Sequence, residues 1–403
     1  MKVLIYTHGF APIIGGAEKY VMLLADGLAR RTATAAAQAL VVNVVTPTPA
    51  GEFDDTQLAF QVVRQPSFLA LARLIHRSDM LHLSGPCLLP LVLGSILRKP
   101  IVIEHHGYTA SCPNGLLLYE PDQSVCPGHF LAGRYGHCLK CVGFKEGLLR
   151  SFSSLLWTFL RRWLCQRVPV NAPITYHVLA RLRLPQSKVI YYGITTPLDS
   201  IGSVGALATN NGLVHFGYVG RLVPLKGLPV LVQAAKFLKE QGYFFRLKFI
   251  GDGPQRTELQ SMVRDLQLDE TVEFVGFVSG DRLHDELKDV SAVIMPSIWE
   301  ETAGLAAIEQ MMRGQLVIVS DIGGLSEVVG DAGLKCIVGD ANSLADCMKR
   351  VLDEPEIVEK MGKAAQARAL SLFQQEGMVD TYLKLYQKLS SSGHVSNVLA
   401  DSL

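Results

Sequence analysis

Short apolar runs alternate with amphipathic stretches along most of the chain, and this alternation limits the fold more than any other feature. In the first half, "KVLIYT" (2–7) and "PIVIEH" (100–105) have the length of buried strands, whereas "GAEKYVMLLADGLARR" (16–31) has apolar residues at helical spacing. The second half repeats this rhythm, for example in "LVHFGYVG" (213–220) and "GLPVLVQAAKFLKEQ" (227–241). Strands separated by helices predict parallel sheets that are covered by helices on both faces.

The chain length predicts two such α/β domains, each doubly wound and Rossmann-like. A chain of 403 residues, 49% of them hydrophobic, is long enough for two cores of ordinary size. We expect a first domain over residues 1–195, a linker rich in Gly, Ser, Thr and Asn over 196–212, and a second domain over 213–370. A C-terminal helix and tail over 371–403 are expected to pack back on the first domain. Two facing domains would leave a cleft along the carboxyl ends of their strands, where open α/β sheets bind ligands.

Charge and targeting signals exclude several other classes of protein. The net charge of +1 argues against a dedicated nucleic-acid-binding protein. The N-terminal "MKVLIYTHGF" is too short for a secretory signal, and no stretch reaches the roughly 20 apolar residues of a membrane span. We therefore expect a cytoplasmic protein whose eight cysteines stay mainly reduced.

The stretch "WEETAGLAAIEQMMRG" (299–314) places Glu301 before Gly304 and Glu309 five residues after it. A helix that begins near Gly304 would offer free backbone N–H groups and a positive dipole end to an anion. Glu309 would lie about 7 Å further along the helix axis. A nucleotide diphosphate fits this layout, with the two carboxylates as hydroxyl acceptors. Taken alone, however, two glutamates at this spacing are more often solvated side chains on a helix surface.

Further motifs surround this stretch. "YVGRLVPLKGL" (218–228) places Arg221 and Lys226 in a loop after the strand that opens the second domain. Two cations in such a loop can neutralise charge that develops on a leaving diphosphate. The alternative is a strand-end arginine and an exposed lysine. "IGDGP" (250–254) and "IGGLSEVV" (322–329) are glycine-rich turns between a strand and a helix, and Glu327 in the second of them is either structural or lines the cleft.

In this order and spacing the motifs resemble those of the family-4 retaining glycosyltransferases, which have the GT-B fold. The resemblance covers most of residues 214–352. In the first half, "GGAEKY" (15–20) resembles the glycine-rich loop that these enzymes place near the donor phosphates and the acceptor, which implies such a role for Gly15 and Gly16. "EHHGYTASCP" (104–113) resembles their strand-end histidine segment, in which His106 would face the sugar.

The resemblance implies transfer of a sugar, with retention at the anomeric carbon, from a nucleoside-diphosphate sugar to an envelope glycan, a lipid-linked acceptor or a small molecule. Catalysis would require no metal or other cofactor. The roles that it implies in the second domain are as follows: Arg221 and Lys226 hold the diphosphate, Glu301 the sugar hydroxyls and Glu309 the ribose, while the amides of Gly304 and Leu305 cradle phosphate.

Three positions depart from the family pattern. Ala303 stands where an aromatic residue is usual, Gly107 stands where an aspartate is common, and Tyr192 replaces an asparagine. The principal contacts remain, but a catalytically inactive binding protein on the same scaffold stays open, as does a sugar-nucleotide epimerase. A nucleotide-dependent dehydrogenase is disfavoured because the first strand is not followed by G-x-G-x-x-G.

Four of the cysteines cluster in an insert over residues 112–141. Four thiolates in a reducing compartment could hold a structural zinc ion in tetrahedral geometry. The alternative is a loop with partly buried thiols, since the spacing is irregular for a zinc finger. The cysteines concerned are Cys112, Cys126, Cys138 and Cys141.

The stretch 144–167 predicts one helix with an apolar stripe and an excess of basic residues. A basic helix that bears tryptophan could rest on an anionic membrane, which would place the protein at the inner face of the membrane and suit a lipid-linked acceptor. The alternative, which the sequence favours, is an ordinary helix packed against the core.

Overall fold

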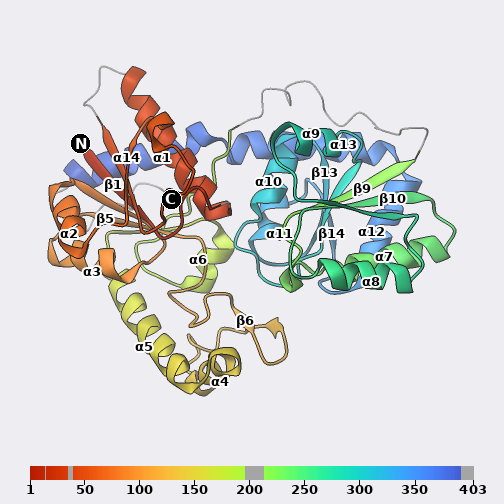
Figure 1. Cartoon of the computed structure of the whole chain (residues 1–403), viewed down its shortest axis with the longest axis horizontal. Coiled ribbons are helices and arrows are strands. Elements are labelled where there is room, and N and C mark those ends of the chain that lie inside the picture. The colour runs from red at the N-terminus through yellow and green to blue at the C-terminus, as the bar shows by residue number, and fades with distance from the viewer. Residues whose placement is uncertain (14, 35–39, 196–212, 392–403) are drawn as a thin grey trace. The chain divides into compact units, whose positions relative to one another are not determined.

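The computed structural model describes residues 1–13, 15–34, 40–195 and 213–391, so the predicted linker 196–212 lies outside the described residues. The chain divides into two compact units (Figure 1). The first unit comprises Met1–Thr195 together with Leu372–Leu403, and the second comprises Thr196–Ser371.

The first unit is built on a parallel sheet with the strand order β3-β2-β1-β4-β5-β8. Its central strand is buried on both faces, since Val3, Leu4 and Ile5 are each at most 1% exposed. The strands are β1 (Lys2–Thr7), β2 (Val41–Thr46), β3 (Gln61–Arg64), β4 (Met80–Ser84), β5 (Ile101–His105) and β8 (Val170–Pro173). The helices connecting them include α1 (Gly16–Thr34), α2 (Phe68–Arg77) and α3 (Leu88–Ile96), and α6 (Tyr176–Leu182) follows the last strand.

The second unit repeats this topology with the order β11-β10-β9-β12-β13-β14. Its strands are β9 (Val214–Val219), β10 (Phe245–Ile250), β11 (Val272–Gly276), β12 (Ala292–Met295), β13 (Leu316–Ser320) and β14 (Leu334–Cys336). Its helices are α7 (Leu228–Glu240), α8 (Arg256–Asp265), α9 (Gly280–Leu287), α10 (Leu305–Met312), α11 (Gly323–Val329), α12 (Ala341–Asp353) and α13 (Glu356–Leu372). Side chains such as Phe216, Leu247 and Ile318 form a continuous buried core.

In each sheet the chain starts in the middle, moves to one edge, and returns to extend the other edge. This is the strand order of doubly wound dinucleotide-binding folds, so the predicted fold class is confirmed for both units. Ligands of such sheets bind at the carboxyl ends of the strands, next to the point where the order reverses. In the first unit this point lies between β1 and β4, and in the second between β9 and β12.

The apolar runs did not predict the edge strands. β3, β8 and β14 have three or four residues each, and β8 contains Asn171 and Pro173, which are uncommon in strands. β11 is the other edge strand of the second unit, and its five residues were also missed.

The C-terminal helix α14 (Gln375–Ser391) belongs to the first unit. The amide of Ile194 donates to Phe373 O at 2.8 Å, and the amide of Gln375 donates to Ile194 O at 3.1 Å. The side chain of Gln375 also donates to Leu23 O in α1 at 2.6 Å. The last 17 residues of regular structure therefore complete the unit that the first residues begin.

The predicted helix over 144–167 is wrong in its extent. It is broken at Gly147, which has φ +81° and separates α4 (Tyr135–Glu146) from α5 (Leu148–Cys165). Both helices extend away from the sheet of the first unit, beside the hairpin of β6 (Leu118–Tyr119) and β7 (Ser124–Val125) (Figure 1). Within the described ranges, no helix is long and apolar enough to cross a membrane.

The expected core-packed orientation of α5 is also wrong. Its buried positions are Ser151, Thr158, Leu164 and Cys165, whereas Leu149 is 88% exposed and Trp157 is 49% exposed. Small polar side chains face inward because they can lie close to the backbone of the insert: Ser151 Oγ donates to Leu139 O at 2.6 Å.

Candidate functional site

The glycine motifs of the second unit bring the loops after β9, β12 and β13 into direct contact. A Cβ on Gly227, which has φ +66°, would lie 2.0 Å from the carbonyl oxygen of Pro296. A Cβ on Gly324 would lie 2.0 Å from the carbonyl oxygen of Thr302. No residue but glycine fits at either position, so "KG" and "GG" allow three loops to meet at the carboxyl end of the sheet.

Lys226 and Glu301 meet in this loop cluster. Lys226 ends a short 3₁₀ turn (Pro224–Lys226), and its Nζ lies 2.8 Å from Glu301 Oε1. The carboxylate also accepts a hydrogen bond from Ser297. The Glu301 side chain is 8% exposed and that of Lys226 is 28% exposed. A buried carboxylate that contacts both a lysine and a hydroxyl has a defined orientation. A group that binds a sugar hydroxyl requires such an orientation.

Arg221 is exposed on the same loop and lies near this pair. Its carbonyl oxygen accepts a hydrogen bond from the Tyr218 hydroxyl at 2.7 Å. Burial and the nearby Glu301 carboxylate raise the pKa of Tyr218, while Arg221 opposes that shift. Tyr218 is therefore within electrostatic reach of both charges, and it holds the backbone from which Arg221 projects.

Helix α10 begins at Leu305, directly after Gly304. Gly304 has φ +79°, and a Cβ there would lie 3.7 Å from Glu301 Oε2. In the described part of the chain, the amides of Gly304, Leu305 and Ala306 donate no hydrogen bond, so they remain available to an anion. Glu309 is the fifth residue of α10 and is partly exposed.

Two other residues of this region that the sequence singled out are Ala303 and Glu327. Ala303, which stands where the family pattern has an aromatic residue, is 1% exposed and directly precedes Gly304. Glu327 lies in α11, where its carbonyl oxygen accepts a hydrogen bond from Arg368 Nη2 at 2.9 Å. This contact involves the backbone of Glu327 alone, so both interpretations of its carboxylate stay open.

In the first unit, the end of β5 carries Glu104, His105 and His106 in succession, so their side chains alternate between the faces of the sheet. His105 is fully buried, and its Nε2 lies 2.9 Å from Asn171 Oδ1. Burial lowers the pKa of His105 to about 4, so this histidine is neutral at pH 7. The His106 side chain is 12% exposed, and its role toward the substrate stays a prediction.

His106 is held by three side chains. Its Nε2 lies 3.1 Å from Glu104 Oε2 and 3.1 Å from Ser84 Oγ, and its Nδ1 lies 2.8 Å from the Tyr192 hydroxyl. The tautomer with the proton on Nε2 donates to Glu104 and accepts from Tyr192. Both ring nitrogens thus have protein partners, and a substrate hydroxyl would have to share Nε2.

Glu104 is the centre of this network and is completely buried. His82 Nε2 lies 3.2 Å from Glu104 Oε1, which is an ion-pair distance, although the N–H is not aligned for a hydrogen bond. Burial alone would raise the pKa of Glu104, but His82 and His106 outweigh it and hold the pKa well below its usual value. Glu104 is therefore an anion at neutral pH.

Four tyrosines enclose the network. His82 Nδ1 lies 2.6 Å from the hydroxyl of Tyr386, and the hydroxyl of Tyr20 lies 3.1 Å from that of Tyr382. Burial and the Glu104 carboxylate raise the pKa of Tyr20, Tyr382 and Tyr386. Tyr192 stacks on His106 with an interplanar angle of 15°. The replacement of asparagine by tyrosine at position 192 thus supplies a direct partner for His106.

The glycine-rich loop of the first unit is occupied by a side chain. A Cβ on Gly15 would lie 2.2 Å from Glu18 Oε2, so the Glu18 carboxylate fills the space beside Gly15. Gly16 is the first residue of α1. A phosphate could approach these glycines only if Glu18 turned away, because two anions repel each other.

The four cysteines of the insert are buried and lie near one another. Burial, followed by the neighbouring Cys112, Cys126 and Cys141 thiols, raises the pKa of Cys138 to about 12. Asn114 Nδ2 donates to Cys141 Sγ at 3.4 Å, and all four cysteines are free of disulfides. Across the described residues, no group of three or more histidine, cysteine or acidic side chains is arranged to hold a metal ion. The zinc site stays a prediction, to be tested by metal analysis of the purified protein.

The structure thus brings together Arg221, Lys226, Glu301 and the start of α10, all within the second unit. His106, Gly15 and Gly16 belong to the first unit, and their convergence with the second stays a prediction. Sequence reasoning missed Ser297, Tyr218 and the partners of His106. Two of these partners carried a signal: Glu104 is an acidic residue at the end of an apolar strand, and Tyr192 departs from the family pattern.

Comparison with known proteins agrees with this geometry. Residues 206–368 match the family model for glycosyl transferases group 1. The matched residues lie in the second unit. They include Arg221, Lys226 and Glu301 of the loop cluster and Glu309 of α10.

Relatives of the chain include two proteins of Streptomyces kanamyceticus. The chain is 36% identical over 141 residues to a 2-deoxystreptamine glucosyltransferase, which covers 34% of this chain and 36% of that protein. It is 26% identical over 174 residues to an alpha-D-kanosaminyltransferase, which covers 43% of this chain and 45% of that protein. The chain therefore spans less than half of the length of each of these relatives.

Similarity of fold to a solved structure covers nearly the whole chain. The crystal structure of Anabaena Alr3699/HepE in complex with UDP has a TM-score of 0.69 with this chain at 19% identity. The match covers 97% of this chain and 100% of that chain. The predicted assignment to the GT-B class of folds is confirmed.

Proposed function

We propose that the chain is a retaining glycosyltransferase that moves a sugar from a nucleoside-diphosphate sugar to a hydroxyl of an acceptor. The observation that carries the proposal is the loop cluster of the group 1 domain. It joins two cations, Arg221 and Lys226, a buried carboxylate, Glu301, and the open amides of Gly304 and Leu305 at one end of a sheet. These groups match the diphosphate and the sugar of such a donor.

In this reaction the bond between the anomeric carbon and the diphosphate oxygen breaks, and the diphosphate leaves with the electron pair. The acceptor oxygen forms the new bond to the same carbon, and its proton passes to the departing diphosphate. Arg221, Lys226 and the start of α10 stabilise the negative charge that grows on the leaving group. Glu301 orients the sugar through its hydroxyls, and Glu309 binds the ribose.

Sugar nucleotides test the proposal directly. We expect the purified chain to release nucleoside diphosphate from at least one of the uridine, guanosine and adenosine diphosphate sugars. A UDP-sugar is the first choice, because the Anabaena neighbour holds UDP. An α-configured product from an α-configured donor would support retention. Epimerised sugar nucleotide, or no turnover of any donor, would overturn the proposal.

We further propose that α5 docks on an anionic membrane surface at the inner face of the membrane. Leu148, Leu149 and Leu156 are 71%, 88% and 65% exposed, which is unusual for neighbouring leucines in one helix. Trp163 lies on the same face at helical spacing and is 50% exposed. Arg150 and Arg167 are exposed near its two ends, where they could meet lipid phosphates.

Flotation with vesicles tests this docking. We expect the protein to float with vesicles that contain phosphatidylglycerol, and Leu149→Glu to reduce the bound fraction severalfold. Leu69→Glu is the matched control, because Leu69 is 62% exposed but lies on α2. Equal loss of binding in both variants, or protein that never floats, would contradict the docking of α5.

A further inference from the structure

Helix α5 contacts the rest of the first unit through polar side chains that donate hydrogen bonds to backbone carbonyl oxygens of other segments. Ser154 Oγ, for example, donates to Pro113 O at 2.7 Å. Near the C-terminus of the helix, Arg161 and Arg162 each donate two such bonds. Because these neighbouring arginines have the same kind of partner, one can serve as a control for the other.

Arg161 joins two loops at the carboxyl end of the sheet. Its Nε donates to Pro86 O at 3.1 Å, in the loop between β4 and α3, and its Nη1 donates to Thr109 O at 3.2 Å, in the loop after β5. The two strands are neighbours, and Ser84 is the last residue of β4 that pairs with β5, opposite Glu104. Beyond this pair Arg161 connects the segments that follow the strands.

The carbonyl oxygen of Pro86 needs a donor from outside its own segment. The residue four positions later is Pro90, which has no N–H, so a helical bond to Pro86 O cannot form. Pro86 is buried, and a buried carbonyl group without a donor costs free energy. In the part of the chain that the structure describes, Arg161 is the only donor to Pro86 O and to Thr109 O.

Both loops adjoin the histidine network. Ser84 lies two residues before Pro86, and its Oγ is 3.1 Å from His106 Nε2. His106 lies three residues before Thr109 and directly after the last residue of β5. The sheet therefore does not fix the backbone of His106, whereas the bond from Arg161 to Thr109 O holds the segment that follows it.

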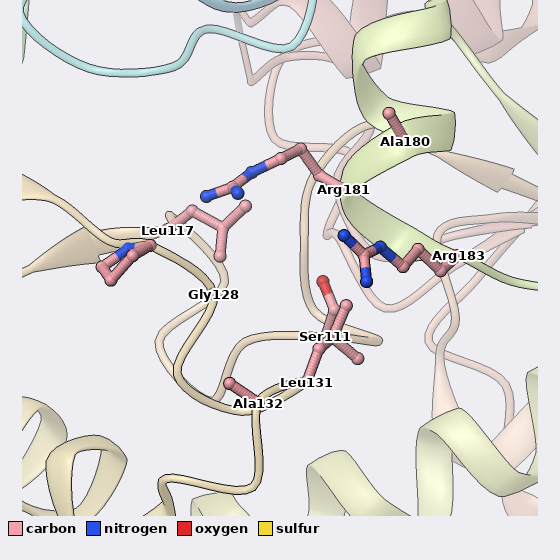
Figure 2. Close-up of a pocket in the computed structure, with 9 residues that line it drawn as sticks. Ser111, Leu117, Gly128, Leu131, Ala132, Ala180, Arg181 and Arg183 are labelled. Atoms are coloured by element: carbon pink, nitrogen blue, oxygen red, sulfur yellow. The ribbon is translucent and has the colours of Figure 1, made fainter.

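Arg162 has similar bonds but holds a different segment. Its Nη1 donates to Leu182 O at 2.8 Å and its Nη2 donates to Arg183 O at 3.1 Å, so it holds the C-terminus of α6. Figure 2 shows the Arg183 side chain there, beside a hollow of about 140 Å³ that Ser111 also lines. Burial lowers the pKa of both Arg161 and Arg162, so both side chains lose part of their hydration. Arg162 thus matches Arg161 in helix, environment and number of bonds, but it bonds to neither loop beside His106.

We propose that Arg161 is the positioning residue of His106. By joining the loops after β4 and β5, it holds His106 at hydrogen-bonding distance from Ser84, in the orientation that Glu104 and Tyr192 also require. This inference rests on the proposed function only in giving His106 a part in turnover. Its effect on the histidine ring needs no substrate.

Nuclear magnetic resonance of the full chain, with labelled histidine and without a ligand, tests the effect on the ring. The Cε1–H signal of His106 is assigned by its loss in His106→Asn, and Ser84→Ala gives the shift that follows loss of the Ser84 contact. We expect Arg161→Ala to move the signal in the same direction as Ser84→Ala, and Arg162→Ala to leave it in place. An unmoved signal in Arg161→Ala, or equal shifts in both arginine variants, would overturn the inference.

Turnover of a sugar nucleotide gives the second measurement. Arg161→Ala should lower kcat by about tenfold or more, because His106 is displaced, and should leave KM for the donor unchanged, because the donor groups lie in the second unit. Arg162→Ala should change neither constant, although it should lose a similar amount of stability. Arg161→Lys should recover part of kcat, since an ammonium group can bond to one carbonyl but lacks the planar fork that bonds to both.

Circular dichroism identifies any variant that fails to fold. If an alanine variant does not fold, the lysine variant of the same arginine replaces it in both measurements. A His106 signal that depends on Arg161, in a chain that turns over no sugar nucleotide, would leave the positioning role standing while the proposed function fails. Turnover with equal kcat in the Arg161 and Arg162 variants would leave the proposed function standing and overturn the positioning role.

Discussion

The two units have the same strand order, but their polar centres are assembled in different ways. In the second unit, Lys226, Glu301 and the start of α10 come from loops that follow neighbouring strands, and glycines without room for a Cβ bring these loops together. In the first unit, Glu104 is surrounded by side chains from β4, β5, α1, α14 and the segment before the linker, and Tyr20 and Tyr382 are 362 residues apart.

This difference separates two kinds of site. The loop cluster places charges where a ligand can reach them, at little cost to the core. The Glu104 network is part of the core, so its residues contribute to stability and to the orientation of His106 together. Substitution of an exposed loop charge such as Arg221 should therefore change activity without changing stability, whereas substitutions in the Glu104 network should change both.

The largest expected effect is on turnover in the loop cluster. Arg221→Ala and Lys226→Ala should each lower kcat by about 10²- to 10³-fold, because each removes charge that stabilises the leaving diphosphate. The rate of release of nucleoside diphosphate measures kcat in each variant. Lys226 is the partner of a buried carboxylate, so Lys226→Ala should also lower the unfolding temperature by several degrees. Arg221→Ala and the exposed control Lys363→Ala should leave the unfolding temperature unchanged. Equal losses of stability in all three variants would contradict this prediction.

Glu104→Gln should affect both properties. Turnover should fall by about 10²-fold, because His106 loses the anion that orients it. The pKa of Glu104 is held below its usual value of 4.5, so the native protein loses stability as the pH falls below that value, and the glutamine variant should lack this loss. Unfolding by urea between pH 3 and 6, together with kcat, measures the two effects. Unchanged turnover would show that Glu104 is purely structural.

His105 should make the first unit sensitive to mild acid. Its pKa falls from 6.5 to about 4 on folding, so the unfolded chain binds the proton more readily. Stability should be constant above pH 6.5 and fall by about 3 kcal/mol as the pH drops from 6.5 to 4. His105→Asn should flatten this part of the profile of unfolding free energy against pH. His76→Asn, at an exposed histidine, should not flatten the profile. An unchanged profile in both variants would contradict the assignment of this pH dependence to His105.

The smallest expected effect tests the link to the C-terminal helix. Tyr386→Phe removes the hydroxyl that lies 2.6 Å from His82 Nδ1 and should reduce the free energy of unfolding by about 1–2 kcal/mol. Calorimetry should show a lower unfolding temperature, with KM for the donor unchanged. Tyr135→Phe provides a control with a more exposed hydroxyl. No difference between these variants would mean that α14 is held by its apolar contacts alone.

The sequence predicted the central strands and the loop motifs well, because these features are local. Burial on both faces requires long apolar runs, as in β1 and β13, and close loops require glycine, as at Gly227. Short edge strands such as β8 lack that pattern, since four residues that include Asn171 and Pro173 carry no periodicity. The break between α4 and α5 was missed because one glycine within a helical pattern does not reveal its backbone angle.

By itself, therefore, the sequence determined the doubly wound class of fold, the order of its motifs and the residues able to hold a diphosphate. Only the tertiary structure decided that α5 turns its leucines outward, that His106 is held by Glu104 and Tyr192, and that Arg161 joins the loops after β4 and β5. Spacing along a chain specifies which neighbours a residue has within one element. Which distant side chains surround a buried charge depends on how whole elements pack, because only packing removes water from that charge and makes its partners necessary.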